Sequence, residues 1–111
     1  MTELVTLYAI AEDRKAHPAE GSYSSYLFGA GLDKILKKLG EESAETIIAA
    51  KNLSGGASRE DFTGEVCDLL YHLIIALVEL EVPLTDVQAE LARRAQKQGN
   101  LKVMRETDKN T

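Results

Sequence analysis

Apolar residues recur every three or four positions along most of the chain, which is the spacing of one face of an α-helix. The pattern predicts helices at about residues 4–16, 31–52, 58–81 and 85–99. No run of residues alternates between apolar and polar in the way that a half-buried strand does. We therefore expect an all-α protein, a bundle of four to five helices.

Polar residues at the ends of these segments indicate where the helices start and stop. Ser58 is suited to the N-cap of the third helix, and Thr85 with Gln88 forms a capping box for the last one. Gly99 suits the C-cap of that last helix. Residues 21–23, between the first two helices, are predicted to form a loop because glycine and serine favour turns.

The third predicted helix is apolar on nearly every side between Val66 and Leu80. A helix of this kind must be covered all round, and three other helices in a chain of 111 residues offer little to cover it. We therefore expect a homodimer, in which a second copy completes the bundle. Residues 1–100 would form this single domain, followed by a polar, flexible tail at residues 101–111.

The composition excludes several classes of protein. With 18 acidic and 13 basic residues the net charge is −5, which repels a phosphate backbone, so nucleic-acid binding is not expected. The longest apolar stretch, residues 69–80, is too short to span a bilayer, and the N-terminus does not resemble a signal peptide. The single cysteine, Cys67, suits a reducing compartment. We expect a cytoplasmic protein without membrane contact.

Two pairs of acidic residues carry the candidate chemistry. Glu42 and Glu45 lie three positions apart in the second predicted helix. Glu65 and Asp68 repeat that spacing in the third, so each pair shares one helix face. A helical hairpin would bring the pairs together, and carboxylates near a core repel one another unless a cation offsets their charge. Oxygen ligands of this kind suit Mg²⁺, or Mn²⁺, better than zinc.

These polar residues also have structural interpretations. Acid pairs on helices are often only solvated surface. Lys38 lies on the face of Glu42, where it either pairs with that residue or contacts a phosphate. Lys51 and Asn52 either cap the end of the second helix or reach a ligand. His72 is expected to be a hydrogen-bonded core residue, as a lone histidine on an apolar helix usually is.

Longer motifs identify a resemblance to a known family. The pattern Glu-Glu-x-x-Glu at residues 41–45, followed by Glu-x-x-Asp at residues 65–68, resembles the signature of the all-α, MazG-like NTP pyrophosphohydrolases. The surrounding sequence narrows the resemblance, over roughly residues 4–94, to the phosphoribosyl-ATP pyrophosphatase family. The segments that carry it are residues 14–15, 21–28, 33–42, 49–52 and 68–72.

The resemblance implies a hydrolase of histidine biosynthesis that converts phosphoribosyl-ATP and water to phosphoribosyl-AMP and pyrophosphate. It also implies a homodimer whose metal ligands are the four acids of the two pairs, and a separate phosphoribosyl-AMP cyclohydrolase for the next step. Our candidate for the group that orients or deprotonates the attacking water is Glu41. The expected substrate-binding residues are Arg14, Lys15, Ser22, Tyr23, Lys38, Lys51, Asn52 and Arg94.

Two other functions are compatible with the same acids. One is a housekeeping pyrophosphohydrolase of the same fold that clears non-standard NTPs. The acids do not separate this function from the first, but residues 21–28 and the Lys37-Lys38 pair favour phosphoribosyl-ATP as the substrate. The other is a non-enzymatic helical dimerisation module, in which the acids are surface and no metal is needed.

Overall fold

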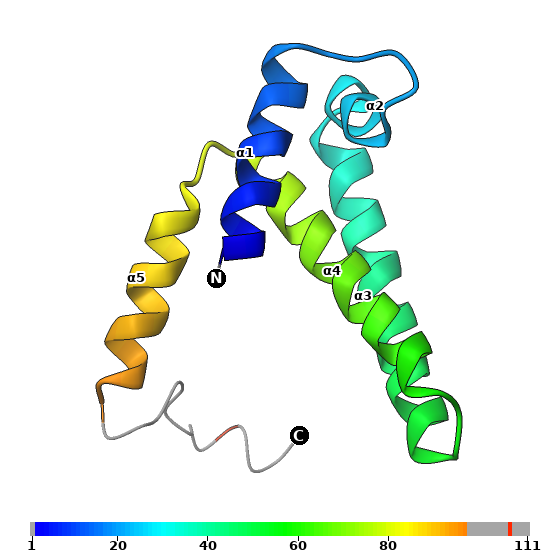
Figure 1. Cartoon of the computed structure of the whole chain (residues 1–111). Coiled ribbons are helices and arrows are strands. Elements are labelled where there is room, and N and C mark those ends of the chain that lie inside the picture. The colour runs from blue at the N-terminus through cyan, green and yellow to red at the C-terminus, as the bar shows by residue number, and fades with distance from the viewer. Residues whose placement is uncertain (1, 98–106, 108–111) are drawn as a thin grey trace.

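The chain folds into five α-helices in a computed structural model, which describes residues 2–97 and residue 107 (Figure 1). No strand occurs among the residues it describes, so the all-α prediction is confirmed. The predicted tail lies outside the described residues, apart from Thr107, and its flexibility stays a prediction. The helices are α1 (Thr2–Ala16), α2 (Tyr23–Ala30), α3 (Leu32–Ser54), α4 (Arg59–Glu79) and α5 (Leu84–Ala95).

Helices α3 and α4 form a long antiparallel hairpin, against which α1 and α2 pack (Figure 1). Its turn is tight because Gly56 takes a φ of +107°, a region that favours glycine, and the Ala57 amide donates to the Asn52 carbonyl at 2.9 Å. Ser58 then starts α4 as predicted, since its Oγ accepts from the amide of Asp61 at 3.3 Å.

The apolar core lies at one end of this hairpin, where α1 and α2 pack against the start of α3 and the end of α4 (Figure 1). Leu27, Ile35 and Ile75 are completely buried there. The other end of the hairpin, at the α3–α4 turn, extends past α1 and α2. The acidic pairs lie between these two ends. The remaining buried apolar residues are Ala11, Ile74, Ala76, Val78 and Leu84.

Helix α2 was not predicted, because a stretch rich in glycine and serine indicated a loop. Ser22 starts the helix as its N-cap, with its Oγ accepting from the Ser25 amide at 3.2 Å. The burial of Leu27 then stabilises a segment that its composition alone would not. A single residue, Gly31 with a φ of +102°, links α2 directly to α3.

The predicted ends of α5 were partly wrong. The helix begins at Leu84, one residue before Thr85, and Pro83 occupies the N-cap position without a side-chain bond. Thr85 therefore lies inside the helix and does not cap it. Helix α5 ends at Ala95, and Gly99, the predicted C-cap, lies outside the described residues. The first turn of α5 lies beside α1, where Thr85 and Gln88 line the same cavity as Tyr8, and the rest of the helix stands away from the other four (Figure 1).

Helix α4 is not covered on every side within one chain. Leu70 and Leu73 are 39% and 41% exposed, and Leu80 is more exposed still. Within the described residues, no helix is both long enough and apolar enough to cross a bilayer. The other large apolar side chains that remain exposed are Val5, Ile10, Tyr23, Tyr26, Leu36, Ile47, Ile48 and Leu91.

Candidate metal centre

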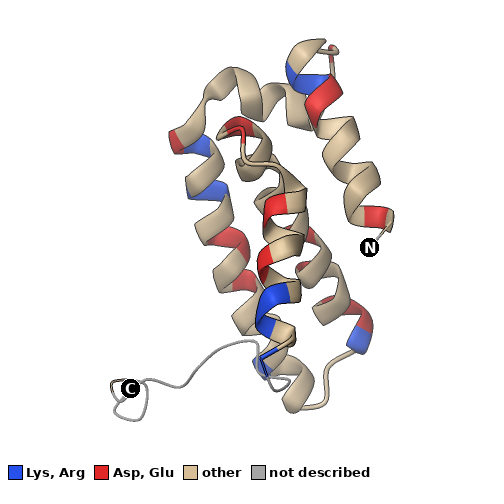
Figure 2. Cartoon of the chain, turned by 90° about the vertical axis from the view of Figure 1, so that its left-hand side faces the viewer, with Lys and Arg blue, Asp and Glu red and all other residues tan. Residues whose placement is uncertain are grey.

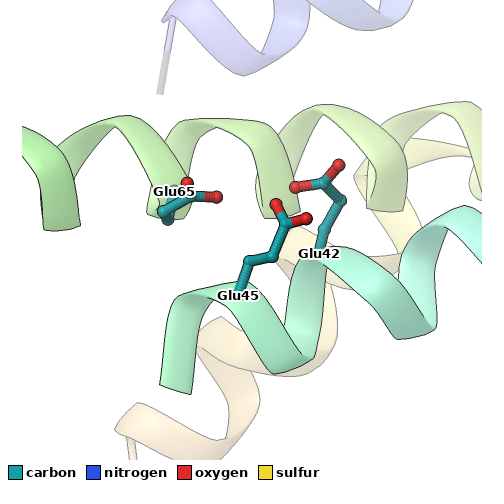
Figure 3. Close-up of side chains that lie close together, drawn as sticks. All are labelled: Glu42, Glu45 and Glu65. Carbon is teal, nitrogen blue, oxygen red and sulfur yellow. The ribbon is translucent and has the colours of Figure 1, made fainter. Parts of the chain in front are cut away.

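Three of the four predicted acids converge midway along the hairpin. Glu42 and Glu45 project from α3 toward Glu65 on α4 (Figure 3), and each offers a carboxylate oxygen within 4.8 Å of those of the other two. The spacing of three residues places both α3 acids on the side that faces α4. Such a group of hard oxygen atoms can hold a divalent cation.

The carboxylates of this cluster are not fully satisfied by the protein. Glu42 is only 8% exposed, and its Oε2 atom is buried without a hydrogen-bond partner. The Oε2 atom of Glu65 is likewise buried and unpartnered. A buried carboxylate oxygen without a partner is costly, and a bound cation removes that cost. The donor set therefore fits a metal ion such as Mg²⁺.

The electrostatics of the cluster point the same way. Burial raises the pKa of Glu42 above its ordinary 4.5, and the neighbouring charge of Glu45 raises it further. Desolvation also raises the pKa of Glu65, with Glu45 and then Asp68 adding to the effect. Like charges held together in this way favour either a proton or a cation between them.

Asp68 is exposed and its carboxylate is not part of the group within 4.8 Å. It is nevertheless close enough for its charge to raise the pKa of both Glu42 and Glu65. Because Asp68 lies one turn along α4 from Glu65, it borders the cluster on the same helix face. The structure thus brings three predicted ligands together and leaves the fourth beside them.

Lys38 and Glu41 form an ion pair at the edge of the cluster, with a distance of 3.2 Å between Nζ and Oε2. The predicted partner of Lys38 was Glu42, so this part of the structural interpretation was wrong. The hydrogen bond to Glu41 raises the pKa of the Lys38 ammonium. Within α3, Lys34, Lys37 and Lys38 come directly before Glu41, Glu42 and Glu45 in the sequence, so positive charge stands next to the carboxylates. Figure 2 shows basic and acidic positions following one another along the helices.

A cavity of about 310 Å³ adjoins the cluster on the side of the α3–α4 turn. Asn52 lines it, which brings one predicted substrate-binding residue next to two of the acids, whereas its neighbour Lys51 is exposed at the end of α3. Sequence reasoning missed Ile48 and Asp61, although each lies about one turn from an acid. The full lining is Glu45, Ile48, Ala49, Asn52, Ala57, Asp61 and Glu65.

Two predicted substrate-binding residues on α1 bond within the chain and lie away from the acids. The ammonium of Lys15 donates to the Glu79 carbonyl at 3.2 Å and pairs with its carboxylate at 3.3 Å. Glu79 is 14 residues beyond Glu65 on α4, which is about 21 Å along the helix axis. Arg14 pairs with its neighbour Asp13 at 3.1 Å.

The remaining predicted substrate-binding residues also form hydrogen bonds within the chain. Ser22 caps α2, as described above. The Tyr23 hydroxyl lies 2.9 Å from Nε2 of His72, which is buried and hydrogen-bonded as expected of a core histidine. On α5, hydrogen bonds from Arg93 and Arg94 lower the pKa of Glu90 to about 2.

The fold and the site together define an all-helical protein in which an antiparallel hairpin presents carboxylates suited to a divalent cation. Residues 4–95 match the sequence model described as Phosphoribosyl-ATP pyrophosphohydrolase, and the chain belongs to that family.

Individual relatives agree with the family match over nearly the whole chain. A protein of Clostridium botulinum is 50% identical over 102 residues, which is 92% of this chain and 89% of the relative. One of Streptococcus sanguinis is 52% identical over 98 residues, covering 88% of this chain and 90% of the relative. One of Listeria welshimeri is 49% identical over 102 residues, or 92% and 94% of the two chains. All three are named phosphoribosyl-ATP pyrophosphatase.

Proposed function

We propose that this protein is a phosphoribosyl-ATP pyrophosphatase, which hydrolyses phosphoribosyl-ATP to phosphoribosyl-AMP and pyrophosphate in histidine biosynthesis. The observation that carries the proposal is the pair of buried, unpartnered oxygens of Glu42 and Glu65 on facing helices. Family membership and relatives of about 50% identity that bear this name support the choice of substrate.

Glu42, Glu45, Glu65 and Asp68 are the proposed ligands of Mg²⁺, with Mn²⁺ as a substitute. When bound, the ion supplies positive charge to the triphosphate and activates water. The first three residues would hold it through the oxygens that now lie within 4.8 Å of one another. Asp68 would complete the set by a rotation of its exposed side chain. Within residues 2–97, no serine or cysteine side chain is hydrogen-bonded to a side-chain base, so direct attack by water is proposed.

Residues around the cluster would bind and orient the substrate. Glu41 would orient or deprotonate the attacking water, and Lys38 would exchange its ion pair with Glu41 for a phosphate oxygen. Asn52 would contact the nucleoside from the adjoining cavity, and Lys51 lies one residue away at the end of α3. The proximity of all four to the acids supports these roles.

The phosphoribosyl group needs further cationic and hydrogen-bonding partners, and we assign these to residues farther from the cluster. Arg14, Lys15 and Ser22 are the candidates in the same chain, and each would exchange an internal partner for substrate. Arg94 on α5 would act in the site of a second subunit, because α5 stands away from the acids of its own chain.

A homodimer is part of the proposal. The exposed apolar residues of α4 and the separation of α5 from the bundle support it, since large apolar surfaces of soluble proteins are usually covered by a partner. The protein would act in the cytoplasm, and a separate phosphoribosyl-AMP cyclohydrolase would consume its product.

The test is pyrophosphate release by the purified protein from phosphoribosyl-ATP, with ATP and dUTP as matched triphosphates. We expect turnover of phosphoribosyl-ATP that EDTA abolishes and Mg²⁺ restores, and slow turnover of the other two. Equal hydrolysis of all three would support the housekeeping alternative. Absence of any metal-dependent turnover would support a dimerisation module. Arg14→Gln should raise the KM for phosphoribosyl-ATP and leave the slow hydrolysis of ATP unchanged.

A further inference from the structure

Both ring nitrogens of His72 are hydrogen-bonded, and the two bonds lead to different helices. Nδ1 lies 2.7 Å from the main-chain carbonyl of Asp68, one turn earlier on α4. A carbonyl can only accept, so Nδ1 carries the proton. In the neutral ring Nε2 is then an acceptor, and the Tyr23 hydroxyl at 2.9 Å donates to it. His72 is buried, with a relative exposure of 4%, so this arrangement is fixed by its surroundings.

These two bonds join α2 to α4 at the helical turn that begins at Asp68, one turn beyond Glu65. The local bond to Asp68 holds the ring in one orientation on its own helix, so that Nε2 is presented to Tyr23 on α2. Helix α2 continues into α3 through the single residue Gly31. The position of Tyr23 against α4 therefore influences how α3, with Glu42, lies against the same helix.

Aromatic packing strengthens the same junction. The Tyr23 ring lies edge-on to His72, with centroids 5.7 Å apart, and stacks on Tyr71 at 6.2 Å and on Tyr26 at 6.3 Å. The charges of Lys38 and Glu42 are close enough to affect the pKa of its hydroxyl, which Lys38 lowers and Glu42 raises. Partial burial raises the pKa of the Tyr23 phenol above its ordinary 10.0, so it remains a hydroxyl and a donor.

We infer that Tyr23 is a positioning residue that acts through His72 to hold the carboxylates of α3 and α4 at metal-binding distance, and that it does not bind substrate directly. The reason is that its hydroxyl donates to Nε2 of His72, a buried acceptor that would be left without a partner if Tyr23 turned toward a phosphate. This inference rests on the proposed function and revises one of its expected substrate contacts. Removal of the hydroxyl at residue 23 should therefore weaken metal binding before it weakens substrate binding.

The test compares Tyr23→Phe with Tyr26→Phe. Both changes remove one hydroxyl from the same aromatic group, but the Tyr26 hydroxyl makes no hydrogen bond within residues 2–97. Mn²⁺ affinity is measured without substrate by calorimetry, and KM and kcat are measured at saturating Mg²⁺. For Tyr23→Phe we expect the Mn²⁺ dissociation constant to rise about 10-fold, as for other residues that orient metal ligands, with an unchanged KM. Tyr26→Phe should behave as the wild type.

A double-mutant cycle with His72→Asn tests whether Tyr23 acts through the histidine. If it does, the losses of Mn²⁺ affinity in the two single variants will not add in the double variant. A raised KM with unchanged Mn²⁺ affinity in Tyr23→Phe would overturn the inference in favour of a direct substrate contact. A lowered melting temperature alone would overturn it in favour of a purely structural role. A wild-type protein that binds no Mn²⁺ would overturn the proposed function, and this inference with it.

Discussion

Thr46 on α3 bonds across the hairpin to the backbone of Glu65 on α4. Its Oγ1 atom lies 2.7 Å from the Glu42 carbonyl on its own helix and 3.2 Å from the Glu65 carbonyl on the facing one. The hydroxyl has one hydrogen, which these two acceptors share. Thr46 therefore fixes the separation of the two helices at the level of the acids.

Thr46→Val keeps the shape of the side chain and removes this bond. We expect it to lower the free energy of unfolding by about 1 kcal/mol, which for a domain of this size corresponds to a melting temperature lower by about 4–8 °C. Thermal denaturation followed by circular dichroism measures the change. Thr46→Ser, which retains the hydroxyl, is the control, and a valine variant as stable as the wild type would show that the bond contributes nothing.

Removal of single acids should separate metal binding from folding. Glu65→Gln leaves the size of the side chain unchanged but takes one charge from the cluster, so we expect Mn²⁺ affinity and turnover to fall about 100-fold or more. The fold should persist, because fewer like charges remain to repel one another. Titration of each variant with Mn²⁺ measures this, together with its melting temperature in EDTA.

Asp68→Asn tests the fourth proposed ligand, which lies outside the group of three. We expect it to lose turnover when Mg²⁺ is limiting. Near-normal turnover of Asp68→Asn under that condition would remove Asp68 from the ligand set and leave the other three.

The raised pKa of Glu42 predicts how the stability of the metal-free protein depends on pH. Because the folded state favours the protonated form, the stabilising contribution of this group is complete below its unfolded pKa, near the ordinary 4.5. It is lost as the pH rises through the higher pKa of the folded state. Glu42→Gln does not ionise, so its advantage in melting temperature over the wild type, in EDTA, should grow as the pH rises above about 4.5. A difference that is constant with pH would contradict the assignment.

The exposed apolar face of α4 predicts that a charge at Leu73 disrupts self-association. We expect the wild type to be a dimer at micromolar concentration by light scattering, with a large apolar interface, and Leu73→Glu to be a monomer or to aggregate. Thr6→Glu, a new charge at an exposed position of α1, is the control. A wild type that remains a folded monomer would rule out the proposed dimer.

Four of the five helices could be predicted because their apolar periodicity reflects the same burial that stabilises them. Helix α2 could not, since its composition indicates a turn and only the burial of Leu27 against distant residues makes it helical. The signal that was available is Ser22, whose spacing from Ser25 suits an N-cap. Local spacing likewise placed the acids on two helix faces. It could not show that Asp68 lies beside the group, because that depends on how far α4 is rotated against α3.

The hydrogen bond from the Tyr8 hydroxyl to the Val82 carbonyl, 2.9 Å long, joins positions 74 residues apart in the sequence. Most other packing is between helices that are neighbours along the chain, above all α3 with α4. Contacts between sequence neighbours cost little loop-closure entropy and form first. The hairpin that carries the acids should therefore assemble early during folding, and the docking of α1 onto the α4–α5 connection should be the late step. Hydrogen exchange during refolding would then protect the amides of α3 and α4 before those of α1.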